Sequence, residues 1–236
     1  MLESNYRRVQ QQISEACVRA KRDPAGVTLV AVSKTQSPES VDALARLGVA
    51  DFGENKVQEA KAKIPLCKGS IRWHGIGHLQ TNKVRDAVDL FRMIHSVDSV
   101  KLARELQKQA KAQGRRLAIL LEVNVSGESS KFGIQPAVLN ALASEVNDLP
   151  HLELQGLMTM APYAEDPEKA RPYFKRLAAL KRDLEQNLGA PLTHLSMGMS
   201  GDFEVAIEEG ATLVRIGTAL FGERKSAAFR AAPSED

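Results

Sequence analysis

Cysteine is scarce in this sequence, and so are long apolar runs. The 236 residues include two cysteines, Cys17 and Cys67, far apart and without a partner motif. We interpret both as free thiols in a reducing compartment. No apolar run approaches the roughly 18 residues of a membrane span. The N-terminal segment MLESNYRRVQQQ is polar and charged, unlike a signal peptide. A cytoplasmic protein without a membrane partner is expected.

An excess of one charge sign is also absent. Lysine and arginine total 32, aspartate and glutamate total 29, and the two signs are intermixed, giving a net charge of +3. A nucleic-acid-binding surface is therefore not indicated. The 43% apolar and 26% charged residues are typical of a globular protein. The length fits one large domain or two small ones and allows a sizeable core.

Several common functional motifs are missing as well. His74 and His78 are four residues apart, but a glycine-containing strand end rather than a helix is expected there. A zinc site is therefore not predicted, and no other histidine or cysteine set has metal-ligand spacing. The sequence contains no Walker-type loop, no dinucleotide fingerprint and no Ser-His-Asp elbow. No metal is predicted.

What is present is a regular alternation of strand-like and helix-like segments. Residues 27–34 (VTLVAVSK) form a short apolar run typical of a buried parallel strand, and Ser37-Pro38-Glu39 then marks a helix start. Seven more strands are expected at 49–54, 71–77, 90–97, 116–126, 152–160, 192–197 and 212–217, with helical segments between them. Eight such repeats fit a closed barrel better than an open doubly wound sheet, the main alternative.

The predicted fold class is therefore α/β, a single (β/α)8 TIM barrel. An extra N-terminal helix is expected over 3–21, where Ile13, Ala16 and Ala20 lie on one stripe. No linker or composition break divides the chain, so 1–236 is expected to be one domain. The Ala-, Ser- and charge-rich residues 223–236 are expected to form a flexible tail.

In such barrels function lies where strands end and βα loops begin. Lys34 ends the first strand-like run, and we expect the chain to be still in a strand there. A lysine at this place is shielded from bulk water, and desolvation lowers a lysine pKa and frees the amine for imine formation. The alternative is a lysine just past the strand that extends into solvent.

Small and hydroxyl residues follow the seventh and eighth expected strands, in Ser196–Ser200 (SMGMS) and in Arg215–Thr218 (RIGT). Barrels commonly bind a phosphate in these two loops, beside a short helix such as the one expected over 202–209. Two ordinary glycine turns are the alternative interpretation.

Arg215 lies inside an apolar strand, and a buried arginine needs an acceptor. The acceptor is either Glu122, in a structural ion pair, or the ring nitrogen of a cofactor. His74 is either a hydrogen-bonded core histidine or a residue of the pocket wall.

Several long motifs then match one family in order along the chain. They are AVSKTQ around Lys34, FGENKVQE around Asn55, WHGIGHLQTNK, VNVSGESSKFG, GLMTM, LSMGMSGDFEVAIEEG and VRIGTALFG. The chain thus resembles the pyridoxal 5′-phosphate (PLP) homeostasis proteins, the YggS or PROSC family. One departure is Gly75, where a bulkier residue, often Phe, is expected; a larger pocket corner at the third strand would follow.

The resemblance implies a barrel like the N-terminal domain of alanine racemase, with PLP held as a Schiff base on Lys34. It also implies the following cofactor contacts. The phosphate is held by Ser196, Ser200, Gly217, Thr218 and the backbone of Met197, the ring nitrogen faces Arg215, and Asn55 and His74 line the ring pocket. Lys131 is expected on a loop over the site.

Two function classes follow from this resemblance. The first is a PLP-binding protein that takes part in intracellular PLP supply, with apo-PLP enzymes as possible recipients and a monomeric state. The second is a PLP-dependent racemase or lyase acting on small amino acids; a barrel aldolase using Lys34 is a weaker third. A protonated arginine keeps the ring nitrogen unprotonated, which makes the ring a poor electron sink. The chain also ends about where the barrel ends, and among its tyrosines only Tyr163 is expected near the site. Both points favour the first class.

Overall fold

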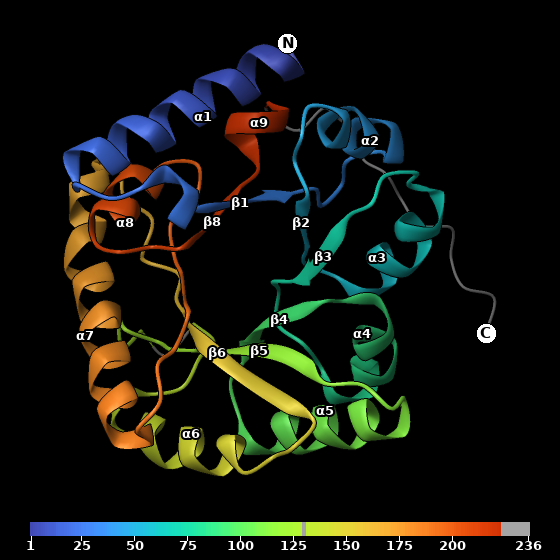
Figure 1. Ribbon diagram of the computed structural model, residues 1–236, viewed down its shortest axis with the longest axis vertical. Coiled ribbons are helices and arrows are strands. Elements are labelled where there is room, and N and C mark those ends of the chain that lie inside the picture. The colour runs from blue at the N-terminus through green and yellow to red at the C-terminus, as the bar shows by residue number, and fades with distance from the viewer. Residues whose placement is uncertain (129–130, 223–236) are drawn as a thin grey trace.

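A computed structural model describes residues 1–128 and 131–222, and it confirms the predicted (β/α)8 barrel (Figure 1). All neighbouring strands pair in parallel, and β8 returns to pair with β1. The strands are β1 (Thr28–Val32), β2 (Asp51–Glu54), β3 (Arg72–Gly75), β4 (Met93–Val97), β5 (Leu117–Glu122), β6 (Leu152–Met158), β7 (His194–Ser196) and β8 (Leu213–Ile216). The predicted tail, 223–236, lies outside the described residues.

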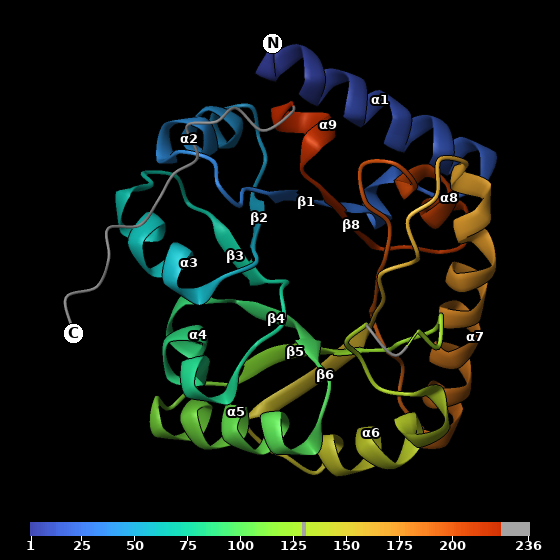
Figure 2. The same cartoon turned by 180° about the vertical axis from the view of Figure 1, so that it is seen from behind.

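Helices surround the strands on the outside, as Figures 1 and 2 show from opposite sides. They are α1 (Leu2–Arg19), α2 (Pro38–Arg46), α3 (Val57–Lys63), α4 (Val84–Leu90), α5 (Val100–Ala112), α6 (Leu139–Asn147), α7 (Arg171–Leu188), α8 (Phe203–Glu208) and α9 (Thr218–Phe221). In the described part of the chain no helix is both long enough and apolar enough to cross a membrane.

Local sequence sets the helix ends. The Ser37 hydroxyl caps α2 by accepting from the Ser40 backbone N–H, and Pro38 occupies the first turn. Ser99 caps α5 in the same way through the Leu102 N–H. Helix α7 ends at Gly189, which adopts the left-handed conformation (φ 64°) that glycine tolerates best.

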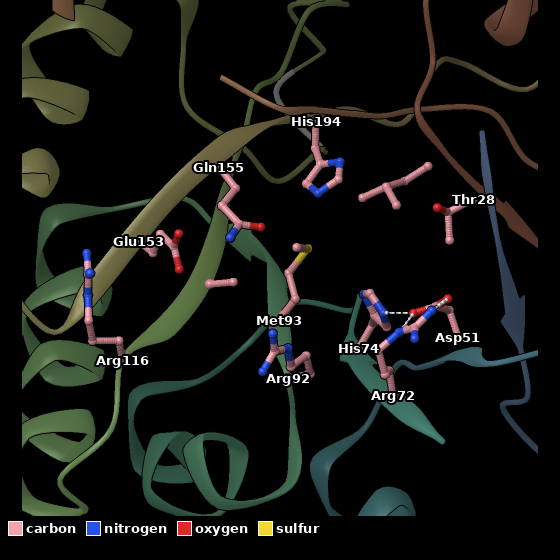
Figure 3. Close-up of a pocket in the computed structure, with 12 residues that line it drawn as sticks. Thr28, Asp51, Arg72, His74, Arg92, Met93, Arg116, Glu153, Gln155 and His194 are labelled. Atoms are coloured by element: carbon pink, nitrogen blue, oxygen red, sulfur yellow. Dashed lines mark hydrogen bonds and ion pairs between the residues drawn. The ribbon is translucent and has the colours of Figure 1, made fainter. Parts of the chain in front are cut away.

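Strand residues divide between two buried regions because successive side chains point to opposite faces. The larger apolar core lies between the strands and the helices. Inside the barrel a smaller apolar cluster is formed by Val30, Met93, Ala118, Leu120, Met158 and Leu213. Near the N-terminal ends of the strands the interior opens into a cavity, which we call the N-terminal mouth (Figure 3).

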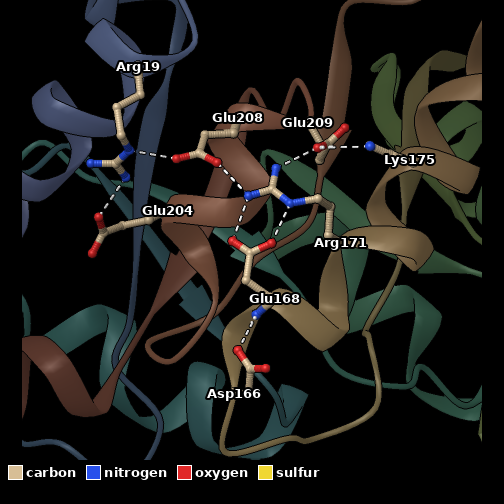
Figure 4. A network of polar contacts seen from close by, with 8 residues as sticks. All are labelled: Arg19, Asp166, Glu168, Arg171, Lys175, Glu204, Glu208 and Glu209. Atoms are coloured by element: carbon tan, nitrogen blue, oxygen red, sulfur yellow. Dashed lines mark hydrogen bonds and ion pairs between the residues drawn. The ribbon is translucent and has the colours of Figure 1, made fainter.

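The predicted N-terminal helix is confirmed as α1, which packs beside α8 and α9 (Figure 1). The Asn5 side chain donates to the Leu220 carbonyl at 2.9 Å. Arg19 of α1 forms ion pairs with Glu204 and Glu208 of α8 (Figure 4). Glu208 also pairs with Arg171 at the start of α7, so the network connects α1, α8 and α7. Partly exposed ion pairs of this kind contribute little stability individually, and burial of the apolar face of α1 is the larger stabilising effect.

Gly77 gives a test of the packing between the loops after β2 and β3. A Cβ atom at Gly77 would lie 2.3 Å from the Asn55 carbonyl oxygen and 2.8 Å from its Cα. Backbone cannot yield as a flexible side chain does, so we expect Gly77→Ala to lower the free energy of unfolding by about 1–3 kcal/mol. Gly26→Ala is the matched control, because no atom lies within 4 Å of its Cβ position. Urea denaturation of both variants is the measurement, and equal midpoints would contradict the prediction.

Candidate functional site

A cavity of about 270 Å³ lies at the C-terminal ends of the strands, where the sequence predicts the site. Six of the predicted site residues line it: Lys34, Asn55, Ser200, Arg215, Gly217 and Thr218. Tyr163, the tyrosine expected near the site, also lines it, and the remaining lining was not predicted: Val32, Ile76, Met160, Ala164, Met199, Gly201 and Asp202. Most of these belong to loops, whose course a strand pattern does not reveal.

Lys34 lies in a turn rather than in a strand, which corrects the sequence-based expectation. Strand β1 ends at Val32, and the Gln36 N–H donates to the Ser33 carbonyl at 2.9 Å to close the turn. Thr35 takes a left-handed conformation with φ 65°, uncommon for a branched residue. Its N–H donates to Glu59 Oε1 at 2.5 Å, which holds the turn in place.

A fully buried lysine, Lys63, stabilises this turn through hydrogen bonds. Its ammonium donates to the Ser33 carbonyl at 2.7 Å, to Glu54 Oε1 at 2.8 Å and to Glu59 Oε1 at 2.7 Å. Burial raises the pKa of Glu54, and the Lys63 charge opposes that rise. Sequence reasoning missed this cluster. The only local signal was the Glu59–Lys63 spacing of four residues, which is common on solvated helix faces.

Two loops form a polar rim on one side of the cavity. The Ser200 hydroxyl accepts from the backbone N–H groups of Gly217 and Ala219, at 3.3 and 3.2 Å, and so joins the loop after β7 to the start of α9. Thr218 is exposed beside it. Asp202 Oδ1 accepts from the Met199 N–H at 2.6 Å. The rim therefore presents hydroxyls and glycine backbone.

Ser196 and Met197 do not belong to this rim, contrary to what the resemblance implied. Met197 is buried in the outer core, and its N–H donates to the Leu213 carbonyl at 3.2 Å. Ser196 is the last residue of β7, and its hydroxyl lies in the barrel interior against Arg215 and His95. The first two residues of the SMGMS segment thus belong to the barrel wall, and only its last two, Met199 and Ser200, line the cavity.

Arg215 is a buried guanidinium that lines the cavity without a carboxylate within ion-pair distance in the described chain. Nη1 donates to the Ser196 hydroxyl at 2.6 Å, and Nη2 donates to the Thr159 carbonyl at 2.9 Å. The predicted alternative, an ion pair with Glu122, is not formed. Burial lowers the pKa of Arg215 to about 10, so the group remains a cationic donor at neutral pH. An acceptor in the cavity would complete its hydrogen bonding.

From Ser196 a chain of buried polar groups runs toward the other end of the barrel. His95 Nδ1 lies 2.9 Å from the Ser196 hydroxyl, His95 Nε2 lies 2.9 Å from His74 Nδ1, and His74 Nε2 lies 3.0 Å from Asp51 Oδ1. Burial lowers the pKa of His95 well below its usual value, so this ring is neutral. His74 therefore contacts Asp51 and lines the N-terminal mouth, and it is not among the residues that line the cavity of Lys34, where the resemblance had placed it.

The two ends of this chain fix its direction. Arg215 can only donate, and Asp51 can only accept, since its hydrogen bonds to His74 and Arg72 hold its pKa at about 2 against the effect of burial. An arrangement with one proton on each imidazole ring satisfies every pair. Ser196 donates to His95, His95 donates to His74, and His74 donates to Asp51. All donors then point from the guanidinium to the carboxylate, an order in which neighbouring bonds polarise one another.

Gly75 does not enlarge the cavity as expected. A Cβ atom at Gly75 would lie 2.8 Å from the ring of Phe91, so the phenyl ring of Phe91 already occupies that space. Gly75 is also absent from the lining of the cavity, to which β3 contributes through the following residue, Ile76.

Glu122, at the end of β5, gives a pH-dependent test of the barrel interior. Burial, reinforced by Asp98 and opposed by Arg215, raises the pKa of Glu122 to about 7. The folded chain then holds a proton that the unfolded chain has lost, so stability should fall as pH rises from about 5 to about 8, by at most roughly 3 kcal/mol. We expect Glu122→Gln to remove this fall, as measured by urea denaturation at both pH values. The exposed control Glu165→Gln should retain it, and an unchanged fall in Glu122→Gln would contradict the assignment.

Comparisons with known proteins agree with this geometry. The family model for the alanine racemase N-terminal domain matches residues 1–225. A pyridoxal phosphate homeostasis protein of Aquifex aeolicus is 47% identical over 219 residues, which cover 92% of this chain and 96% of that protein. One of Pseudomonas aeruginosa is 48% identical over 221 residues, covering 93% and 94% of the two chains.

Solved structures show the same relationship. PipY of Synechococcus elongatus, determined with PLP bound, superposes with a TM-score of 0.80 at 36% identity, covering 91% of this chain and all of PipY. Alanine racemase of Clostridium difficile shares the fold alone, with a TM-score of 0.72 at 16% identity. The chain spans 97% of its own length in that match but 58% of the racemase. This chain therefore belongs to the alanine racemase N-terminal domain family and, within it, to the pyridoxal phosphate homeostasis proteins.

Proposed function

We propose that this protein binds PLP in the cavity at the C-terminal ends of the strands and takes part in intracellular PLP homeostasis. The observation that carries the proposal is the lining of that cavity, which combines an amine, a buried guanidinium and a rim of hydroxyls and glycine backbone. These three features match the three polar parts of PLP, namely the aldehyde, the ring nitrogen and the phosphate. The PLP-bound PipY structure and the names of the curated relatives support the same cofactor.

Each residue then has a definite task. Lys34 provides the amine that holds the aldehyde covalently, and the turn fixed by Glu59 and Lys63 sets the position of that amine. Ser200, Gly217 and Thr218 receive the phosphate with neutral donors. Val32, Ile76 and Met160 provide apolar contacts for the ring. Asn55, at the edge of the cavity, is proposed to contact the ring substituents.

Arg215 determines what the bound cofactor can do. PLP supplies an electrophilic aldehyde and a ring that accepts electrons, most strongly when the ring nitrogen is protonated. Arg215 keeps its own proton at neutral pH, because its pKa is about 10. The ring nitrogen opposite it must then accept a hydrogen bond and stay unprotonated. The protein is thus suited to holding PLP and poorly suited to carbanion chemistry.

The alternative function is a racemase or lyase acting on small amino acids, which needs a second acid or base over the ring. Tyr163 is the tyrosine that lines the cavity, and its side chain is 92% exposed at the mouth. A phenol so open to water is not held against a substrate. We therefore propose a carrier that acts as a monomer in the cytoplasm and supplies apo-PLP enzymes.

The assignment of Lys34 is tested by substitution. We expect Lys34→Ala to lose covalently held PLP, because the lining of the cavity contains no other lysine in the described residues. The measurement is borohydride reduction of the PLP-treated protein followed by peptide mapping. The control Lys56→Ala removes an exposed lysine next to Asn55 and should leave labelling intact. Full labelling of another lysine in Lys34→Ala would contradict the assignment.

Carrier and enzyme are separated by comparing transfer with turnover. We expect PLP-loaded protein to restore the activity of an apo-PLP enzyme, because the cavity opens directly to water. We also expect α-proton exchange of amino acids in heavy water to be slow, since Arg215 withholds protonation of the ring nitrogen. Lys34-dependent exchange faster than about 1 s⁻¹, as in a typical enzyme, would reject the carrier and favour the alternative.

A further inference from the structure

The N-terminal mouth of the barrel contains a second cavity, of about 290 Å³, which the proposed function does not use. It lies at the starts of the strands, at the opposite end of the barrel from Lys34. Its charged lining residues are Asp51, Arg72, Arg92, Arg116 and Glu153 (Figure 3). A cavity of this volume is at the lower end of the range for small-molecule sites.

Some charged residues of this lining form ion pairs with one another, and others do not. Arg72 forms a two-pronged pair with Asp51, from Nε to Oδ1 at 2.7 Å and from Nη2 to Oδ2 at 2.5 Å. Asp51 also receives the hydrogen bond of His74, so both of its oxygens are occupied. Arg92 and Arg116 form no ion pair with any described carboxylate, including Glu153 in the same lining. Among the described residues, Arg92, Arg116 and Glu153 therefore form no ion pair, and the lining has an excess of positive charge.

The remaining lining residues suit a small anion rather than a cation. Gln155 and His194 lie across the cavity from Arg92 and His74 (Figure 3). Burial lowers the pKa of His194, so this ring is a neutral hydrogen-bonding group. Met93, Ala118 and Leu213 are buried and give the lining an apolar part. Two guanidinium groups that share one lining with apolar side chains match a molecule with carboxylates at the ends of a short carbon chain.

We propose that the N-terminal mouth is a second ligand site, which binds a small dicarboxylate through Arg92 and Arg116. The site is separate from the PLP cavity, so it does not rest on the proposed function. Arg92 and Arg116 bind the carboxylates, Gln155 and His194 complete the hydrogen bonding, and Arg72 stays on Asp51.

Succinate is the probe, titrated calorimetrically into the full chain with and without PLP. We expect binding in both cases, and a dissociation constant raised at least about tenfold in the variant Arg92→Ala/Arg116→Ala, which loses two charge-assisted hydrogen-bonding groups. Both arginines are exposed, so the fold should survive their removal, and thermal melts check this. Arg182→Ala, an exposed arginine of α7 outside the cavity, is the matched control and should bind as the unaltered protein does.

A second control separates the two cavities. Thr218→Val alters the rim of the PLP cavity and should leave succinate binding unchanged. Titration with inorganic phosphate tests whether a single anionic group is sufficient, and we expect it to bind more weakly than succinate. The proposal is overturned if succinate does not bind, if the double variant binds it as well as the unaltered protein, or if Thr218→Val or added PLP abolishes binding. A failure to bind PLP would reject the proposed function. The succinate titration without PLP could still be interpreted, since it does not depend on PLP binding.

Discussion

The buried guanidinium of Arg215 constrains much of the barrel interior. Removing such a charge from water costs several kcal/mol unless its donors are satisfied. The structure satisfies it with a hydroxyl and a carbonyl, from Ser196 and Thr159, instead of an adjacent carboxylate. The nearest neutralising charge along the hydrogen bonds is Asp51, beyond two imidazole rings. This separation leaves the cation effective at the cavity while the chain of aligned donors still stabilises it.

The same arrangement fits the proposed role, in which the site holds PLP and catalyses little chemistry on it. An ion pair between Arg215 and Glu122 would have reduced the positive potential next to the ring. Instead, burial raises the pKa of Glu122 to about 7, so this carboxyl is partly neutral near physiological pH. On the opposite side, the turn of Lys34 depends on charged groups that do satisfy one another, in the cluster of Lys63, Glu54 and Glu59. The cavity thus has a cluster of paired charges beside Lys34 on one side and, on the other, the guanidinium of Arg215, which is the group proposed to face the ring nitrogen.

Much of the fold and part of the site could be predicted from the sequence, and the errors share a physical cause. Alternating apolar segments identified all eight strands, and reading the strand ends found Lys34, Ser200 and Arg215. The misplaced residues were those whose direction depends on strand ends that differ by one or two positions. Ser196 still belongs to β7 and faces the interior, and His74, although near the end of β3, contacts Asp51 at the start of β2. Stagger between neighbouring strands in a tilted barrel brings such residues to one level, and periodicity does not reveal this stagger.

Long-range pairs were the other limit. Phe91 fills the space beside Gly75 from across the β3–β4 pair, so a small residue that suggested an opening marks a close contact. The spacing of Lys63 from Glu59 is typical of a solvated helix face, and only the folded chain shows that Lys63 contacts the turn after β1.

The chain of hydrogen bonds also connects the two mouths of the barrel. The Ser196 oxygen accepts from Arg215 Nη1 and lies 2.9 Å from His95 Nδ1, so the guanidinium is held by a member of this chain. At the other end, Arg72 and His74 share the carboxylate of Asp51. The ion pair at the N-terminal mouth therefore supports, through two imidazole rings, the hydrogen bond that orients Arg215 at the other end of the barrel.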